Sequence, residues 1–175
     1  MRPAPEDGDA VPGSVDADAY RDAVARLAGG VAVVTARSGT GVDHAVVTTS
    51  VVSASLDPPL VLFVLHADSR VNDLVGVGRT WAVSVVTARA APAVAWLSEP
   101  GRPGLGQLTG IAHHAGAASG AALLDAAAAW VECRTRWVRG AGDHDVVVGD
   151  VLAVHLGDGS DGALVHRLGR VLPAP

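Results

Sequence analysis

The sequence predicts a mainly β protein with a few helices, whose strands form an antiparallel barrel. Short runs of β-branched and apolar residues recur along most of the chain, turns rich in glycine or proline separate them, and helical patterns occupy only two or three segments. About six strands joined by short turns favour a closed antiparallel sheet over βαβ units.

The N-terminal region divides into a tail and a helix. Residues 1–14, MRPAPEDGDAVPGS, are rich in proline, glycine and acidic residues, and we expect a disordered tail there, with one folded domain over 15–175. The stretch SVDADAYRDAVARLAGG that follows predicts a helix. Ser14 or Asp16 can cap this helix, and Gly29–Gly30 is expected to end it.

The rest of the chain is mostly strand. Short helices are expected within 69–78 and 89–98, and a loop is expected over the Gly-, Ala- and Pro-rich stretch 98–120. The expected strands, in chain order, are VAVVTA (31–36), HAVVTTSVVSASL (44–56), LVLFVL (60–65), TWAVSVV (80–86), AAWVECRTRWV (128–138), HDVVVGDVLAVHL (144–156) and ALVHRLGRV (163–171).

Composition excludes several classes of function. The formal net charge is −5 and no basic block is present, so neither nucleic acid nor a membrane surface is an expected partner. No apolar run is long enough to span a bilayer, no secretory signal is expected, and the single Cys133 suits a reducing compartment, so we expect a cytoplasmic protein. All 13 basic residues are arginines, which makes arginine the one side-chain cation available for a phosphate.

Spacing gives little support to metal or nucleophile chemistry. The adjacent histidines His113 and His114 point in different directions on any regular element, so we expect no protein-bound metal. No GxSxG motif selects a nucleophilic serine. Cys133 lies mid-strand among apolar neighbours, where it is expected to be a small buried hydrophobe.

Three polar stretches remain as candidate sites. The hydroxyl-rich strand TTSVVSAS (48–55) is either a solvated strand face or the wall of a polar ligand site. Ser69 and Arg70, at an expected helix start, form either a phosphate cradle or an ordinary cap beside a surface arginine. In the trio Asp143-His144-Asp145, alternation of strand faces turns His144 away from both aspartates, which weakens a three-ligand metal site.

Taken in order, the strand and turn motifs resemble the flavin reductase family with the FMN-binding split-barrel fold. The resemblance covers about residues 18–97 and 122–171. The motifs that carry it are RDAVARLAGGVAVVTA, TTSVVSASLDPPLVLFVL, SRVNDL, WAVSVV, WVECR, GDHDVVVGDV and LVHRLGRV.

The resemblance implies a homodimeric, six-stranded antiparallel split β-barrel that binds FMN or FAD. It also implies hydride transfer from NADH or NADPH to the flavin, which then passes in reduced form to a partner flavin-dependent monooxygenase. Such transfer is intrinsic to the two cofactors, so the protein orients the rings and stabilises charge on the reduced flavin.

Site residues are implied by the same resemblance. The expected flavin-ring wall comprises Thr48, Thr49, Ser50, Ser53 and Ser55. Ser69 and Arg70 are expected at the flavin phosphate or ribityl chain, and Ser84 stands where the family usually has an asparagine. The turn Gly142-Asp143-His144 is expected near the nicotinamide, with His144 as the catalytic or positioning residue.

The chain departs from the family pattern after the helix expected within 89–98. Family members commonly carry an Asp-Arg-Phe segment there, whereas this chain reads GRPGLGQLTGIAHHAG without an aromatic residue. Val171 likewise replaces a usual tyrosine or phenylalanine. These departures leave two alternatives open, a split barrel that uses its pocket for another biosynthetic reaction and a flavin-binding module without catalysis.

Overall fold

A computed structural model describes residues 15–174 and confirms a mainly β fold. The described helices are α1 (Ala17–Val24) and α2 (Ala91–Leu97), with 3-10 turns at Asn72–Leu74 and Ala88–Ala90. The strands are β1 (Gly29–Gly30), β2 (Ala32–Arg37), β3 (Asp43–Thr48), β4 (Val52–Leu56), β5 (Pro59–His66), β6 (Thr80–Val86), β7 (His113–Ala115), β8 (Ala122–Leu124), β9 (Ala127–Ala141), β10 (His144–Leu156), β11 (Ala163–Arg167) and β12 (Arg170–Ala174).

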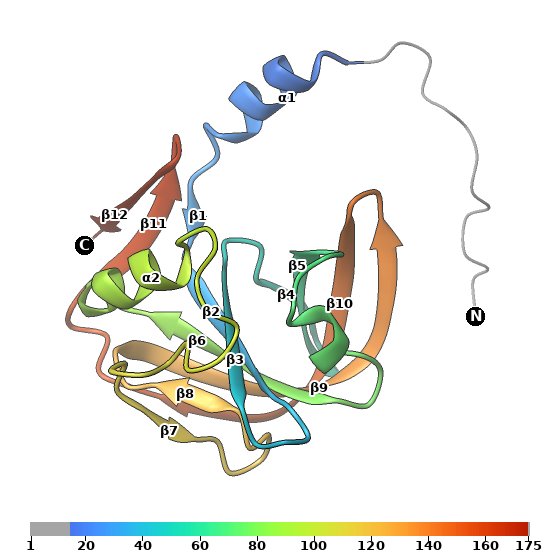
Figure 1. The fold of residues 1–175 in the computed structure, drawn as a ribbon, viewed down its shortest axis with the longest axis vertical. Helices are drawn as coiled ribbons and strands as arrows, with labels where there is room; N and C mark the ends of the chain where they lie inside the picture. Colours follow the sequence, from blue (N-terminus) through green and yellow to red (C-terminus); the bar gives the residue numbers. More distant parts are fainter. Residues whose placement is uncertain (1–14, 175) are drawn as a thin grey trace.

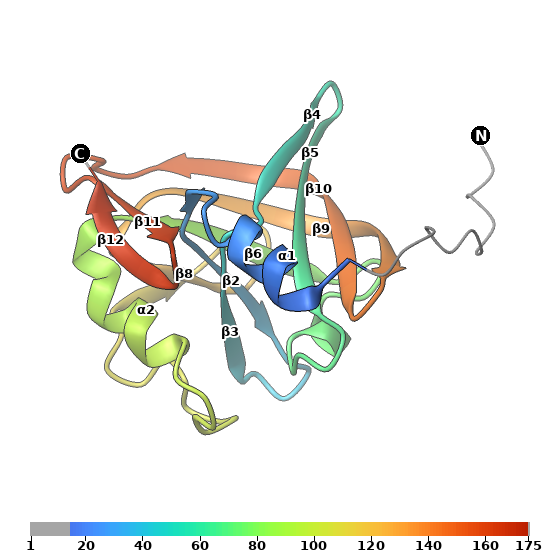
Figure 2. The ribbon, with the colours of Figure 1, turned by 90° about the horizontal axis from the view of Figure 1, so that it is seen from above.

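The main sheet is antiparallel and curled, and its two edge strands, β3 and β4, follow one another in the sequence (Figure 1). Its order is β3-β2-β6-β9-β10-β5-β4, which is seven strands where six were expected. The difference arises because the expected strand 44–56 breaks at Thr49–Val51 into β3 and β4, which lie at opposite edges of the sheet. Figure 2 shows the β4–β5 hairpin projecting beyond the rest of the sheet.

Two apolar cores lie on the two faces of the sheet. The inner core contains Phe63 and Trp81, whose ring centroids are 4.8 Å apart in an edge-to-face arrangement. The Trp81 indole N–H donates to Thr135 Oγ1 at 2.8 Å, so the polar atom of this buried ring is satisfied. The second core packs Val94 and Leu97 of α2 against the opposite face. Burial on both faces explains why β2 and β6 read as continuous apolar runs.

The N-terminal helix is shorter than expected. Asp16 is its N-cap, with Oδ1 accepting from the Ala19 N–H at 2.7 Å, and the helix ends at Val24. Gly29–Gly30 does not end the helix but forms β1, which pairs with β11. Ser14 and the expected tail 1–14 lie outside the described residues.

Three other expectations are corrected. The helix expected over 69–78 reduces to the 3-10 turn at Asn72–Leu74, and the stretch 98–120 contains the short strand β7, paired with β8. The strand expected over 163–171 is a hairpin, β11–β12, in a separate three-stranded sheet with β1. None of the helices within residues 15–174 has the length and apolar character needed to cross a membrane.

Candidate functional site

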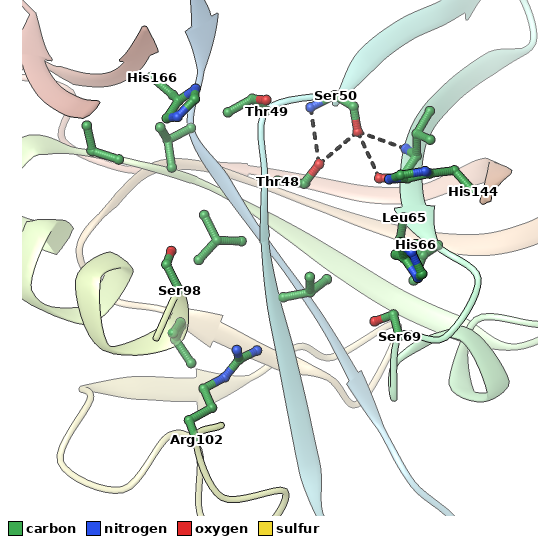
Figure 3. A pocket seen from close by; sticks show the side chains of 16 residues that line it. Thr48, Thr49, Ser50, Leu65, His66, Ser69, Ser98, Arg102, His144 and His166 are labelled. Carbon is green, nitrogen blue, oxygen red and sulfur yellow. Dashed lines mark hydrogen bonds between the residues drawn. The ribbon is translucent and has the colours of Figure 1, made fainter. Parts of the chain in front are cut away.

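A cavity of about 590 Å³ opens beside the corner where β3 passes into β4 (Figure 3). This volume lies within the range of roughly 300–1,000 Å³ that is typical of small-molecule and cofactor sites. The lining residues come from six parts of the chain, namely Val31, Val46, Val47, Thr48, Thr49, Ser50, Val64, Leu65, His66, Ser69, Leu97, Ser98, Arg102, His144, His166 and Val171.

One wall is a corner fixed by hydroxyl hydrogen bonds. The Val64 N–H donates to Ser50 Oγ at 2.8 Å, and Ser50 Oγ donates to the Val64 carbonyl at 3.0 Å. Because the single Ser50 proton is then used, Thr48 Oγ1 is the donor in its 2.7 Å contact with Ser50 Oγ, while it accepts from the Ser50 N–H. The Ser50 side chain thus takes the place of a strand residue beside β5 and sets the direction of the wall, on which Thr49 is exposed.

A pair of histidines lines the cavity beside this corner (Figure 3). His66 of β5 and His144 of β10 are cross-strand partners, and their ring centroids are 5.2 Å apart in an edge-to-face arrangement. His144 Nδ1 lies 2.7 Å from Asp143 Oδ1, and this hydrogen bond lowers the pKa of the exposed Asp143 carboxyl. The contact fixes the His144 ring and leaves its Nε2 for another partner. His166 lies across the cavity from this pair (Figure 3).

The cavity continues into a smaller hollow of about 290 Å³ that holds two arginines. Arg102 lines both hollows, and its Nη2 donates to the Ala45 carbonyl at 3.1 Å. Burial lowers the pKa of Arg102, and the positive charge of Arg70 lowers it further. The Arg102 Nε is buried and has no hydrogen-bond partner among residues 15–174. Two neighbouring arginines that line one hollow are suited to a phosphate group.

The structure brings five of the predicted site residues into the main cavity, with one in the adjoining hollow. Thr48, Thr49, Ser50, Ser69 and His144 line the cavity, and Arg70 lines the hollow beside Ser69. The expected helix N-terminus at Ser69 is absent from the described structure, since only a 3-10 turn follows.

Three predicted hydroxyls lie elsewhere. Ser53 and Ser55 are on β4, which has crossed to the other edge of the sheet after the break at Thr49–Val51, so they do not line the cavity. Ser84 is fully buried, and its Oγ accepts from the Leu124 N–H at 3.1 Å, which leaves it no route to a ligand in the cavity.

The remaining predicted residues form the β9–β10 turn. The turn itself consists of Gly142, whose φ is 70°, and Asp143. Both residues precede His144 in the chain, and neither lines the cavity. The Asn72 side-chain amide donates to Asp145 Oδ2 at 2.6 Å, whereas Asp143 bonds to His144, which corrects the expectation that His144 points away from both aspartates.

Four polar residues of the cavity were not predicted as site residues, namely His66, Ser98, Arg102 and His166. Arg102 carried a usable signal, because it is the single arginine of the divergent stretch 98–120 in a chain without lysine. The other three had none, since their approach depends on strand pairing and on where α2 ends.

Other chemistries find little support in the described part of the chain. Across residues 15–174, no group of three or more His, Cys, Asp or Glu side chains is arranged to hold a metal ion. Burial, with Asp150 and Glu132 nearby, raises the pKa of Cys133 to about 12, so the thiol is protonated at neutral pH. His113 and His114 lie on β7, outside the cavity.

The cavity is suited to a ligand with a planar ring and an anionic tail. A planar ring can lie along the hydroxyl wall and contact the apolar side chains of Val46, Val47 and Leu97, while an anionic tail reaches the two arginines.

Comparison with known proteins agrees with this interpretation of the cavity. Residues 24–174 match the model of a family described as the flavin reductase like domain. The chain is 38% identical over 151 residues to an NADH-dependent FMN reductase, AsuE2, of Streptomyces nodosus subsp. asukaensis, covering 86% of this chain and 80% of the relative. It is 34% identical over 143 residues to the actinorhodin polyketide dimerase of Streptomyces coelicolor, covering 82% and 78%.

A solved structure shares the fold. The styrene monooxygenase flavin reductase SMOB from Pseudomonas putida S12 superposes with a TM-score of 0.77 at 28% identity, covering 89% of this chain and 97% of SMOB. The split-barrel fold expected from the sequence is confirmed by this similarity.

Proposed function

Since the chain belongs to the flavin reductase like domain family, we propose that it transfers a hydride from NADH or NADPH to FMN or FAD. We further propose that the reduced flavin passes to a partner flavin-dependent monooxygenase. The observation that carries the proposal is the joined pair of hollows, which offers a hydroxyl wall for a ring and two arginines for a phosphate. The names of AsuE2 and SMOB support NADH as the donor and a monooxygenase as the recipient.

When bound, the flavin and the nicotinamide supply the redox chemistry themselves, and the residues of this chain bind and orient them. In the proposal, the corner at Thr48, Thr49 and Ser50 supports the ring. Ser69 and Arg70 hold the ribityl chain or phosphate. His144, fixed by Asp143, orients the nicotinamide.

The proposal includes a homodimer in the cytoplasm. Exposed apolar side chains support the dimer, because the β4–β5 hairpin presents Leu56 at 88% exposure and the end of β10 presents Leu156 at 83%. Sedimentation equilibrium at micromolar concentration is expected to give twice the monomer mass of 17.6 kDa. A monomer at that concentration would remove the dimer from the proposal and leave the chemistry untouched.

A spectroscopic assay tests the activity. The purified protein, mixed with NADH or NADPH and with FMN or FAD, is expected to oxidise the nicotinamide faster than the protein-free mixture, followed by loss of nicotinamide absorbance. Background rates with all four pairs would refute the reductase.

Two variants test the residue roles. His144→Ala is expected to raise the KM for NAD(P)H more than the KM for flavin, because the imidazole is proposed to face the nicotinamide. Arg70→Ala is expected to do the reverse, because it removes a cation from the phosphate end. Wild-type behaviour of both variants would refute these roles even in an active reductase.

A second candidate keeps the pocket and changes the reaction. The relative named actinorhodin polyketide dimerase favours a biosynthetic conversion of another substrate by this fold. The same assay separates the two, since flavin binding without nicotinamide oxidation would favour the second candidate or a non-catalytic flavin-binding module.

A further inference from the structure

The loop that carries Arg102 lies against the outer edge of β3. Edge strands leave every second residue with an unpaired N–H and C=O, and Ala45 presents both groups outward from β3. Ala45 is 1% exposed, so water does not satisfy these groups. Two side chains of the loop pair with them instead.

Gln107 and Arg102 grip the same residue of β3. Gln107 Oε1 accepts from the Ala45 N–H at 3.0 Å, and Arg102 Nη2 donates to the Ala45 carbonyl at 3.1 Å. The two side chains thus replace a neighbouring strand at Ala45.

Gln107 also ties the loop to itself and to α2. Its Nε2 donates at 3.2 Å to the backbone carbonyl of Pro103, the residue after Arg102. The backbone carbonyl of Gln107 accepts from the Trp96 indole N–H at 2.9 Å. Gln107 is 3% exposed; it does not line the main cavity, but it forms part of the wall of the smaller hollow beside Arg102. A neutral amide is well suited here, because a carboxylate at this position would attract the Arg102 guanidinium away from a ligand.

We propose that Arg102 is a specificity-determining residue that selects a phosphate-bearing flavin, and that Gln107 is the positioning residue that holds Arg102 in place. This inference rests on the proposed function of the same cavity. Nothing in the sequence motifs of the resemblance assigns a role to either residue, because both lie in the divergent stretch 98–120. The Arg102 guanidinium, which is half-buried and lines both hollows, supplies the donor for the phosphate.

The arginine pair gives the inference its chemistry. Arg70 Nη1 lies 3.4 Å from the Arg102 carbonyl, so Arg70 contacts the Arg102 backbone while both side chains line the smaller hollow. Glu99 is the acidic residue that lines the same hollow, and it is exposed. The cations outnumber this one carboxylate, which favours a dianionic group between them.

The test compares FMN with riboflavin, which has the same ring without the phosphate. Dissociation constants come from flavin fluorescence titration of the wild type, Arg102→Ala, Gln107→Met and the double variant. Gln107→Met keeps the side-chain volume and removes both amide hydrogen bonds, which favours a folded product. Thr109→Val, in the same loop and outside both hollows, is the matched control.

We expect Arg102→Ala and Gln107→Met each to weaken FMN binding by about tenfold, as for loss of a hydrogen bond to a charged group. Riboflavin binding is expected to change by less than about twofold in both, and Thr109→Val to match the wild type. In the Arg102→Ala background, Gln107→Met is expected to add no further loss, because it acts through that arginine. Pyrophosphate is expected to compete with FMN on the wild type and not on Arg102→Ala.

Three results would overturn the inference alone while the wild type still binds and reduces FMN. The first is equal loss of FMN and riboflavin in Gln107→Met, which indicates a general structural role. The second is full additivity of the two substitutions, and the third is unchanged FMN binding in Arg102→Ala. If the wild type binds neither flavin, the proposed function fails, and the inference fails with it.

Discussion

The two halves of the stretch 98–121 are held by buried polar side chains of different charge. The first half, beside the cavity, is fastened by the neutral Gln107 to an edge strand. The second half lies over the outer face of the main sheet and is fastened by Glu132 of β9, whose side chain is fully buried. Glu132 Oε2 accepts from the Ala118 N–H, the Ser119 N–H and Ser119 Oγ at 2.9, 2.6 and 2.7 Å.

The different charges of Glu132 and Gln107 have different consequences for stability and for ligand binding. A buried carboxylate with three donors and the His155 ring 3.1 Å from Oε1 gives strong hydrogen bonds, but it fixes a negative charge in place. Such a charge is harmless on the far face of the sheet, whereas beside Arg102 it would compete with a ligand phosphate. We infer that the charged Glu132 holds the loop where no ligand is expected, and that the neutral Gln107 holds it where an anion is expected.

The largest expected effect is the loss of the Glu132 carboxylate. Glu132→Met is expected to lower the free energy of unfolding by about 4 kcal/mol, because three donors lose the buried carboxylate that accepts from them. Gln107→Met, the matched substitution in the other half, is expected to cost about 1–2 kcal/mol. Urea denaturation of both variants measures the difference. Equal losses would show that charge does not distinguish the two fastenings.

Paired glycine substitutions sharpen the comparison through space alone, since neither glycine has a left-handed φ. A Cβ at Gly116 would overlap the Glu132 carboxylate and lie 2.8 Å from Ser119 Oγ, whereas a Cβ at Gly104 would meet the movable end of Arg70 at 2.9 Å. Gly116→Ala is expected to cost about 2–3 kcal/mol and Gly104→Ala less than about 1 kcal/mol. Thermal unfolding of both variants tests the order, and the reverse order would contradict the assigned packing.

The smallest expected effect is a pH dependence confined to the Glu132 half. Burial acts to raise the pKa of Glu132, but the hydrogen bonds from Ser119, His155 and Ala118 outweigh it and lower the pKa below the ordinary glutamate value. A lowered folded-state pKa stabilises the protein at pH above the unfolded value, and this contribution is lost as pH falls through the folded pKa.

Urea unfolding between pH 7 and pH 3 is therefore expected to show a smaller acid loss for Glu132→Met than for the wild type. Gln107→Met is the control and is expected to keep the wild-type pH slope, because an amide does not titrate. An unchanged acid slope in Glu132→Met would contradict a role for this carboxyl in acid stability.

Local patterns predicted much of the fold. The apolar runs of β2, β5 and β6, the cap at Asp16 and the α2 segment all follow from side-chain periodicity and capping chemistry. The expected burial of Cys133 is also confirmed, since this side chain is fully buried in β9. The burial of the neighbouring Glu132 was not predicted, and it arises because the loop 116–121 covers this side chain.

The candidate site was less accessible to sequence reasoning. Thr48, Thr49 and Ser50 line the cavity as predicted, whereas Ser53 and Ser55 do not. The strand breaks between these two groups, and the side-chain periodicity of the sequence gives no sign of that break. Arg102 and Gln107 are held by hydrogen bonds to the backbone of Ala45, some sixty residues earlier in the chain. Contacts of that range depend on how the sheet curls.

By itself, the sequence determined the β class, the family resemblance and the identity of the only side-chain cations, because these depend on residue type and local spacing. The tertiary structure decided which residues share the cavity, which carboxylate is buried and which arginine meets Arg70. These properties arise where strands distant in sequence pair and loops cover them, so the free energy that places each side chain comes from long-range packing and hydrogen bonding.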